Sequence, residues 1–148
     1  MQRFSSSLLV ALAVVPALEA HSQERLVDTL RDQRAVWGCS WSASSPDVGQ
    51  GFILLAERDE SLLLMNIGGT DVRLALDAGS DTGSPSRVGD RLTKTYSAPS
   101  IRVEATYTAT WMCPPGAEGC EVTRFDVTFV VTKGDRTETV QGTGEVGC

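Results

Sequence analysis

Glu104 and Asp126, each with an arginine two residues before it, are the residue types that glycoside hydrolysis uses. That reaction needs one carboxylic acid to protonate the leaving oxygen and one carboxylate to act as base or nucleophile. Arg102 and Arg124 share the faces of the two acids if both segments are strands. Ion pairing between neighbouring strands accounts for the four charges more simply. We therefore interpret both acids as solvent-facing strand residues, with a small hydrolase as the alternative.

A second candidate for catalysis is Asp81, in Asp81-Thr82-Gly83-Ser84. This segment resembles the Asp-Thr-Gly-Ser motif of aspartic proteases, in which two carboxylates share one proton. In that family the motif follows an apolar strand, whereas Gly79 and Ser80 precede Asp81 here. Because 77–90 is rich in Gly, Ser and Asp, we interpret it as a surface loop, and an Asp81 hydrolase is the alternative.

His21, the only histidine, becomes the N-terminal residue if a signal peptide is cleaved after Ala20. Small secreted β-sandwiches are known that hold copper through an N-terminal histidine brace, but such a brace needs a second imidazole. We interpret His21 as an exposed polar terminus. The sequence thus predicts no catalytic residue, no cofactor and no metal site.

The four cysteines Cys39, Cys113, Cys120 and Cys148 predict two disulfides. Their number is even, they form no Cys-x-x-Cys pair, and they follow a predicted secretory signal. The short, turn-rich segment between Cys113 and Cys120 favours a bond there, which leaves Cys39–Cys148. Joining residues about 100 positions apart restricts the unfolded chain by roughly 4–5 kcal/mol.

Local sequence patterns divide the 148 residues into three parts. Residues 1–20, with Arg3, an apolar run over 8–17 and a small Ala20, predict a secretory signal peptide. Residues 21–34 could form a short helix, and residues 35–148 form a single disulfide-stapled β domain. We expect a secreted or periplasmic protein with no membrane span after cleavage. The net charge of −6, with no Lys/Arg cluster, argues against nucleic acid as a partner and suits a cationic protein.

Alternating apolar residues from Ile101 to Trp111, and again from Phe125 to Val131, predict a long β-hairpin with one buried face. An unbroken ladder cannot place Cys113 directly opposite Cys120. Either their bond closes the loop beyond the ladder, which we expect, or a bulge near Val122 shifts the register. A Gly- and Thr-rich strand over 136–148 is expected at a sheet edge. Other strand patterns lie at 35–41, 51–56, 62–67, 72–76 and 92–96. About eight strands and at most one short N-terminal helix predict an all-β antiparallel sandwich or small barrel.

Structural motifs carry a resemblance to known proteins. They are Cys39 on the first strand, a Cys-Pro-Pro tip closed by Cys120, Glu121-Val122-Thr123 on the return strand, and the final Gly147-Cys148. Over most of 35–148 the chain resembles a group of small exported bacterial β-proteins of unassigned activity. The pattern of 62–76 around Gly68-Gly69 is similar, more faintly, to periplasmic C-type lysozyme inhibitors, which are compact acidic β-barrels. The second resemblance implies an inhibitor-like role.

These observations favour an exported, non-catalytic domain whose surface loops bind a protein or a glycan, in the manner of an inhibitor or another binding module. A structural component of the envelope is the first alternative. A small hydrolase that uses Asp81 or the Glu104/Asp126 pair is the second. The loops 77–90 and 116–118 are the segments at which we expect a binding surface.

Overall fold

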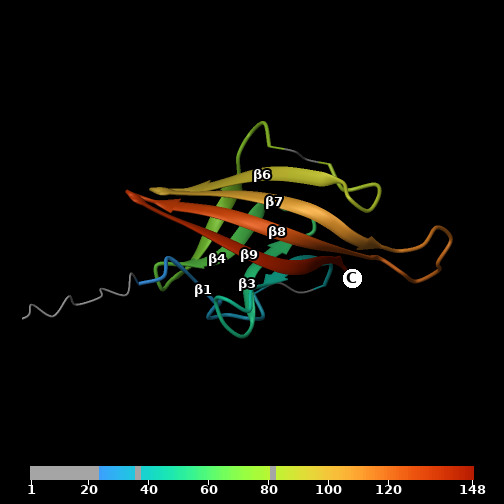
Figure 1. The fold of residues 1–148 in the computed structure, drawn as a ribbon, viewed down its shortest axis with the longest axis horizontal. Helices are drawn as coiled ribbons and strands as arrows, with labels where there is room; N and C mark the ends of the chain where they lie inside the picture. Colours follow the sequence, from blue (N-terminus) through green and yellow to red (C-terminus); the bar gives the residue numbers. More distant parts are fainter. Residues whose placement is uncertain (1–23, 36–37, 81–82) are drawn as a thin grey trace, which may run out of the picture.

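The computed structural model describes residues 24–35, 38–80 and 83–148, and within these ranges the chain forms nine β-strands (Figure 1). Their bounds are β1 Val27–Asp28, β2 Ser40–Ser44, β3 Phe52–Glu57, β4 Leu62–Ile67, β5 Asp71–Leu76, β6 Arg91–Ala98, β7 Ile101–Met112, β8 Val122–Lys133 and β9 Arg136–Gly147. The three last strands are the longest, at 12 residues each, and β7 and β8 are the two arms of the predicted hairpin.

Eight of the strands close into an antiparallel barrel. They follow the order β4-β3-β2-β9-β8-β7-β6-β5, and β5 pairs back onto β4. The short β1 lies outside this ring, where Val27 faces Ile67 of β4. The prediction of an all-β antiparallel fold is confirmed, and of the two expected architectures the chain adopts the barrel. Each of the eight strands thus has a neighbour on both sides, although β5 and β6 share only the pairs Ala75–Ser97 and Leu76–Tyr96.

The apolar face of the long hairpin fills the barrel interior. Its facing pairs include Val103–Val131, Ala105–Phe129 and Tyr107–Val127, and all six side chains are at most 3% exposed. Burial of one such valine or aromatic side chain stabilises the fold by about 1.5–3 kcal/mol. The period-two alternation therefore predicts this part of the core correctly.

The register of β7 against β8 shifts by one residue near the mouth of the hairpin. Ala109 faces Phe125, but Trp111 faces Arg124, so Thr110 is a bulge residue. A shift of one residue turns the following side chains to the other face. Trp111 therefore lies outside the barrel, 39% exposed, and Arg124 lies over its ring at 5.3 Å from the centroid. The prediction that Trp111 belongs to the buried set is wrong.

The prediction that 136–148 forms an edge strand is also wrong. β9 lies between β8 and β2: it pairs with β8 along its whole length and with β2 over Thr143–Gly147. Its glycines allow this close approach: a Cβ on Gly144 would lie 2.0 Å from the Ser42 carbonyl oxygen, and one on Gly142 would lie 2.7 Å from that of Ser44. The glycine content that suggested a weak edge therefore reflects tight packing against β2.

The N-terminal segment is extended where a short helix was expected. Among the described residues 24–34, β1 is the regular element, and the side chains of Leu26, Val27 and Leu30 are buried against the barrel. The amides of Leu26 and Val27 donate to Glu138 Oε2 at 2.5 and 3.0 Å. A helix would satisfy those amides internally, but here a carboxylate from β9 and pairing with β4 satisfy the backbone instead.

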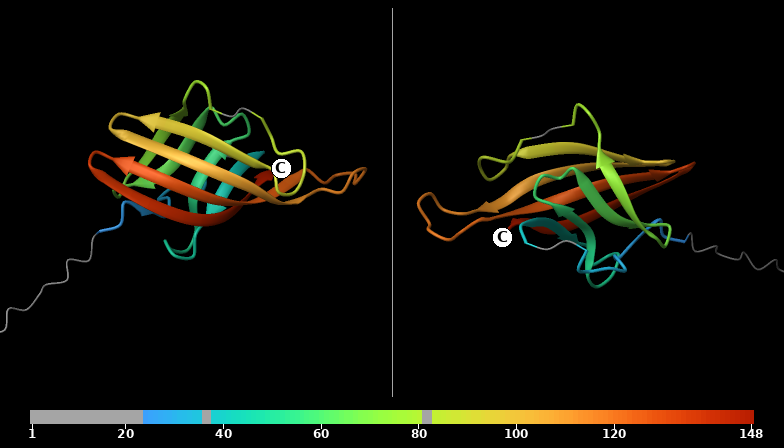
Figure 2. Two further views of the ribbon diagram at one scale, coloured as in Figure 1. Left: turned by 45° about the horizontal axis from the view of Figure 1, so that its top comes forward. Right: turned by 180° about the vertical axis from the view of Figure 1, so that it is seen from behind.

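The two ends of the barrel differ in their connections (Figure 2). One end, called the turn end, carries the short connections 68–70, 99–100 and 134–135, together with the loop 45–51. The other, called the mouth, carries the turn 58–61, the long loops 77–90 and 113–121, and the C-terminus. The loop 113–121, drawn in orange, reaches well beyond the barrel wall in both views.

Candidate binding site at the barrel mouth

A hollow of about 450 Å³, called the mouth hollow, opens at the mouth of the barrel. Its lining comes from segments far apart in the sequence and mixes polar with apolar side chains: Trp41, Arg58, Ser84, Pro85, Met112, Cys113, Cys120, Glu121, Val122, Thr123, Val146 and Gly147. Its volume lies within the range of small-ligand sites, about 300–1,000 Å³, and the mouth of a β-barrel is a common place for one. The loop 77–90 and the base of the loop 113–121 thus border one concave surface, whereas 116–118 are exposed outside it.

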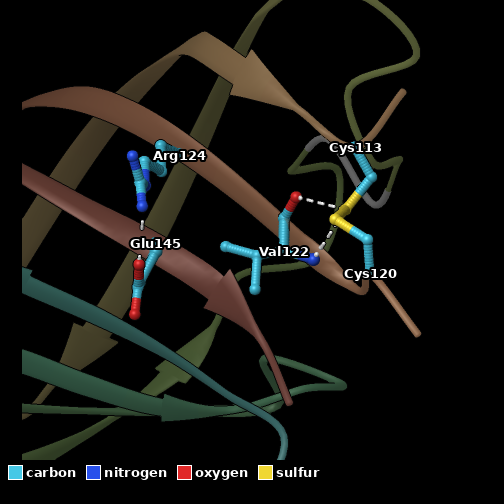
Figure 3. Close-up of a disulfide and its surroundings, with 5 residues drawn as sticks. All are labelled: Cys113, Cys120, Val122, Arg124 and Glu145. Carbon is cyan, nitrogen blue, oxygen red and sulfur yellow. Dashed lines mark hydrogen bonds and ion pairs between the residues drawn. A yellow bond between two sulfur atoms is a disulfide. The ribbon is translucent and has the colours of Figure 1, made fainter. Parts of the chain in front are cut away.

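The Cys113–Cys120 disulfide forms one wall of the mouth hollow (Figure 3). The β7–β8 ladder ends at the pair Met112–Thr123, so the bond closes the loop beyond the ladder, as predicted. Cys113 Sγ lies 3.3 Å from both the amide nitrogen and the carbonyl oxygen of Val122. The amide donates to the sulfur, while the oxygen only touches it because a half-cystine carries no hydrogen. These contacts fix the base of the loop to β8.

The Cys39–Cys148 disulfide joins the chain just before β2 to its last residue, across 109 positions. It therefore holds the ends of β2 and β9 together beside the mouth hollow. Arg58, from the turn after β3, donates from Nη1 to Cys148 Sγ at 3.7 Å. Both predicted disulfide pairings are thus present, and both lie at the mouth.

Trp41 forms the floor of the mouth hollow from its place on β2. The indole is 3% exposed and packs against Tyr107 and Phe125, with ring centroids 5.1 and 5.3 Å away. Tyr107 and Phe125 in turn meet edge to face at 5.1 Å. Such aromatic contacts add about 0.5–1.5 kcal/mol each beyond burial, so the floor is rigid.

A buried ion pair lies beneath this floor. Lys94 of β6 is fully buried, with Nζ 4.8 Å from the centroid of the Trp41 ring, and it pairs with Glu60 Oε2. The Tyr96 hydroxyl donates to the other carboxylate oxygen, Glu60 Oε1, at 3.2 Å. Glu60 enters the barrel from the β3–β4 turn with φ of 53°, a left-handed conformation uncommon outside glycine.

Burial raises the pKa of Glu60 above its ordinary value, although Lys94 and Tyr96 act in the opposite direction. Burial also raises the pKa of Tyr96 and of Tyr107, so both phenols stay protonated and can donate. Sequence reasoning missed this cluster. The available signal was Lys94 itself, which occurs in phase with Leu92 and Tyr96 on the inward face of β6.

The loop 77–90 is held to the barrel at both of its ends. Asp77 Oδ2 accepts from the Ser97 hydroxyl at 2.9 Å and pairs with Arg102 at 3.3 Å. At the other end, Asp90 accepts from the amides of Ser86 and Arg87 and from their side chains. These hydrogen bonds, led by that from the Ser86 amide, lower the pKa of Asp90 to about 2. The segment that contributes Ser84 and Pro85 to the mouth hollow is therefore anchored.

The two acids considered for glycoside hydrolysis lie apart. Asp126 faces Thr108 on β7, and Glu104 is four residues farther along that strand, which is about 13 Å at the rise of a β-strand. Both are exposed. The predicted ion pairing also has different partners, since Arg102 pairs with Asp77 and Arg124 with Glu145 at 3.9 Å. Carboxyl groups of glycosidases are about 5–9.5 Å apart, so this separation does not suit that reaction.

Several sequence candidates lie outside the described residues. These are the predicted signal peptide over 1–20, His21, and Asp81 with Thr82. Gly83 and Ser84, the other two residues of the protease-like motif, are exposed.

The described ranges show neither a cluster of metal-ligand side chains nor a membrane-spanning helix. In 24–35, 38–80 and 83–148, no three His, Cys, Asp or Glu side chains come together as metal ligands would. The same ranges contain no helix long and apolar enough to cross a membrane. Comparison with protein-family models, with curated proteins and with solved structures gave no match for this chain.

Proposed function

We propose that this protein is an exported, non-catalytic binding domain that holds a segment of a cationic partner protein in the mouth hollow. The observation that carries the proposal is the hollow itself, which combines a mixed polar and apolar lining with a fixed frame. Binding sites are commonly built in this way, from loops placed by a rigid scaffold. The two disulfides are compatible with export.

Charge favours a cationic partner. The chain carries 19 acidic and 13 basic residues, and exposed Glu121 is among the residues that line the hollow. Exposed Asp59 and Glu118 lie in the two neighbouring connections of the mouth. Arg58 is the cationic side chain of the lining, and it is turned toward Cys148. Complementary charge of this kind raises association rates and fixes orientation more than it raises affinity.

The rigid floor and walls of the mouth hollow favour a binding role over a catalytic one. The floor is an aromatic stack above a buried ion pair, and the walls are tied by two disulfides, so little conformational freedom is lost when a partner binds. The ionisable groups with the most strongly raised pKa, Tyr96 and Tyr107, are buried beneath the floor and not in the hollow. This arrangement supports a preformed receptor surface.

The test uses a defined cationic protein. Because the sequence resembles C-type lysozyme inhibitors, we choose a C-type lysozyme as the first probe and measure binding by titration calorimetry. We expect saturable binding to the wild-type protein, and at least tenfold weaker binding to Glu121→Lys. The matched control is Glu104→Lys, the same charge reversal on the outer wall, which should bind within twofold of the wild type.

A second experiment tests for partners other than lysozyme. Immobilised wild-type protein is exposed to an envelope extract, and each captured protein is then titrated against the same three proteins. Absence of any saturable partner, or equal weakening by both charge reversals, would contradict the proposal. A change in envelope integrity on deletion, without such a partner, would favour the structural alternative instead.

A further inference from the structure

A second hollow, of about 350 Å³, lies on the outer wall of the barrel and is called the wall hollow. It spans β8, β9 and β2, which run side by side. Figure 3 shows two of its residues, Arg124 and Glu145, on neighbouring strands close to the Cys113–Cys120 disulfide. The function proposed above does not use this hollow.

The register arranges its polar side chains in two short rows. The first row crosses β8, β9 and β2 and consists of Arg124, Glu145 and Ser42. The second row lies two residues farther along the same strands and consists of Asp126, Thr143 and Ser44. Neighbouring strands are about 4.8 Å apart, and residues two apart on one face are about 6.7 Å apart. The six side chains therefore offer carboxylates, hydroxyls and a guanidinium on a grid whose spacing is on the scale of one sugar ring.

Apolar surface lies beside these rows. Half-buried Phe52 of β3 lines the hollow, whereas Phe125 is 2% exposed and its ring packs in the barrel core against Tyr107. A saccharide presents the same combination, with hydroxyl groups around its rim and C–H groups on its faces. The Arg124–Glu145 pair is loose, at 3.9 Å with both side chains more than half exposed, so both groups can turn toward a ligand.

Other ligand classes fit less well. Two carboxylates against one guanidinium disfavour an anion such as phosphate or nucleic acid. A peptide cannot extend the sheet here, because β8, β9 and β2 are each hydrogen-bonded on both sides. We propose that the wall hollow binds a neutral saccharide, whose vicinal hydroxyl groups hydrogen-bond to Asp126, Glu145 and Arg124.

The experiment titrates three neutral probes, cellotetraose, maltotetraose and tetra-N-acetylchitotetraose, into the ¹⁵N-labelled protein that lacks residues 1–20. We expect at least one probe to shift the amide signals of Ser42, Thr143 and Glu145 saturably. Asp126→Ala should weaken that binding at least tenfold. Glu104→Ala removes an exposed carboxylate from the same outer face beyond the hollow, and it should leave the affinity within twofold.

The mouth variant Glu121→Lys separates this proposal from the preceding one, because it should bind the saccharide normally while losing a cationic protein partner. The saccharide proposal is overturned if none of the three probes binds saturably. It is equally overturned if Asp126→Ala and Glu104→Ala weaken binding alike, or if tetralysine displaces the bound saccharide from the same amides.

Discussion

The two ends of this barrel are stabilised in different ways. At the turn end, Leu26 and Val27 pack against the barrel and their amides donate to Glu138, and the connections 68–70, 99–100 and 134–135 are short. At the mouth, two disulfides and the Lys94–Glu60 pair hold long loops around a hollow. The turn end therefore relies on local packing and hydrogen bonds, whereas the mouth relies on covalent and ionic links.

This difference suggests that the mouth is constrained to keep a shaped surface, whereas the turn end only closes the barrel. Long loops lose more conformational freedom on ordering than short turns do, so a shaped surface built from loops needs added constraints. The constraints at the mouth hold such a surface in one conformation, and a surface that is already ordered loses less entropy on binding, as the proposed function requires. The turn end needs no such constraints because its connections are short.

The largest expected change in the free energy of unfolding is that on removing the Cys39–Cys148 disulfide, and it should exceed the change on removing Cys113–Cys120. Replacing Cys39 and Cys148 by serine should lower the free energy of unfolding by about 4–5 kcal/mol, because that bond closes a very long loop in the unfolded chain. Replacing Cys113 and Cys120 should lower it by only about 2–3 kcal/mol, since the closed loop is short. Urea denaturation of the two double variants checks this order, and an equal or reversed order would contradict it.

The next effect concerns the buried ion pair. Lys94→Met leaves the Glu60 carboxylate buried without its cation and should lower the free energy of unfolding by about 3–5 kcal/mol near neutral pH. Adding Glu60→Gln should restore most of the loss. Lys133→Met serves as a control at the turn end, where the ammonium lies 3.5 Å from the Ile67 carbonyl oxygen, and should cost less than about 1 kcal/mol.

The pH dependence of Lys94→Met gives a second readout of the same pair. Burial already raises the pKa of Glu60 above 4.5, and loss of Lys94 raises it further. A folded-state pKa above the unfolded one makes the fold most stable below about 4.5, with stability lost as the pH rises through the folded value. Denaturation of the variant that is independent of pH between 4 and 8, or a double variant as unstable as Lys94→Met, would contradict this account.

A smaller effect is expected at the turn end. Glu138→Gln weakens the hydrogen bonds from the amides of Leu26 and Val27 and should lower the free energy of unfolding by about 1–2 kcal/mol. Glu104→Gln, an exposed change on the same barrel, should stay within about 0.5 kcal/mol of the wild type. Thermal denaturation of both variants measures the difference. Equal stabilities would show that the N-terminal segment is not held in this way.

The smallest effect is local to the loop 77–90. Because the pKa of Asp90 is lowered from 3.8 to about 2, its hydrogen bonds to Ser86 and Arg87 are fully present above pH 3.8 and are lost as the pH falls toward 2. The amide signals of these two residues should shift with a midpoint near 2, and Asp90→Asn should remove that transition. A midpoint at 3.8 or above would contradict the anchoring.

Alternation along β7 and β8 was sufficient to predict the long hairpin and its buried face, because side-chain direction in a strand follows the sequence directly. The all-β class needed the other strand patterns as well, and the short disulfide followed from the turn-rich segment between Cys113 and Cys120. Two features could not be derived in this way. The parity of the cysteines allows a bulge near Val122, but the alternation continues through Trp111 and does not show that the bulge lies at Thr110. Closure of the ring through β2–β9 joins strands about 100 residues apart, and period-two patterns do not distinguish a barrel from a sandwich.

The candidate site was less accessible to sequence reasoning than the fold. The loops and cysteines that border the mouth hollow could be named in advance, but not the common surface that they form. Glu60 lies in a four-residue polar turn and pairs with Lys94, 34 positions away, so no local pattern links them. The two rows of the wall hollow likewise depend on the register of three strands, which only the folded chain sets.

The central claim is that the mouth, and not the turn end, is the binding end of this barrel. Hydrogen exchange measured with and without a saturating C-type lysozyme tests it most directly. We predict slower exchange in 83–90 and 113–121, and unchanged exchange in the turns 68–70 and 134–135. Protection at those turns with none in the two mouth loops would contradict the claim.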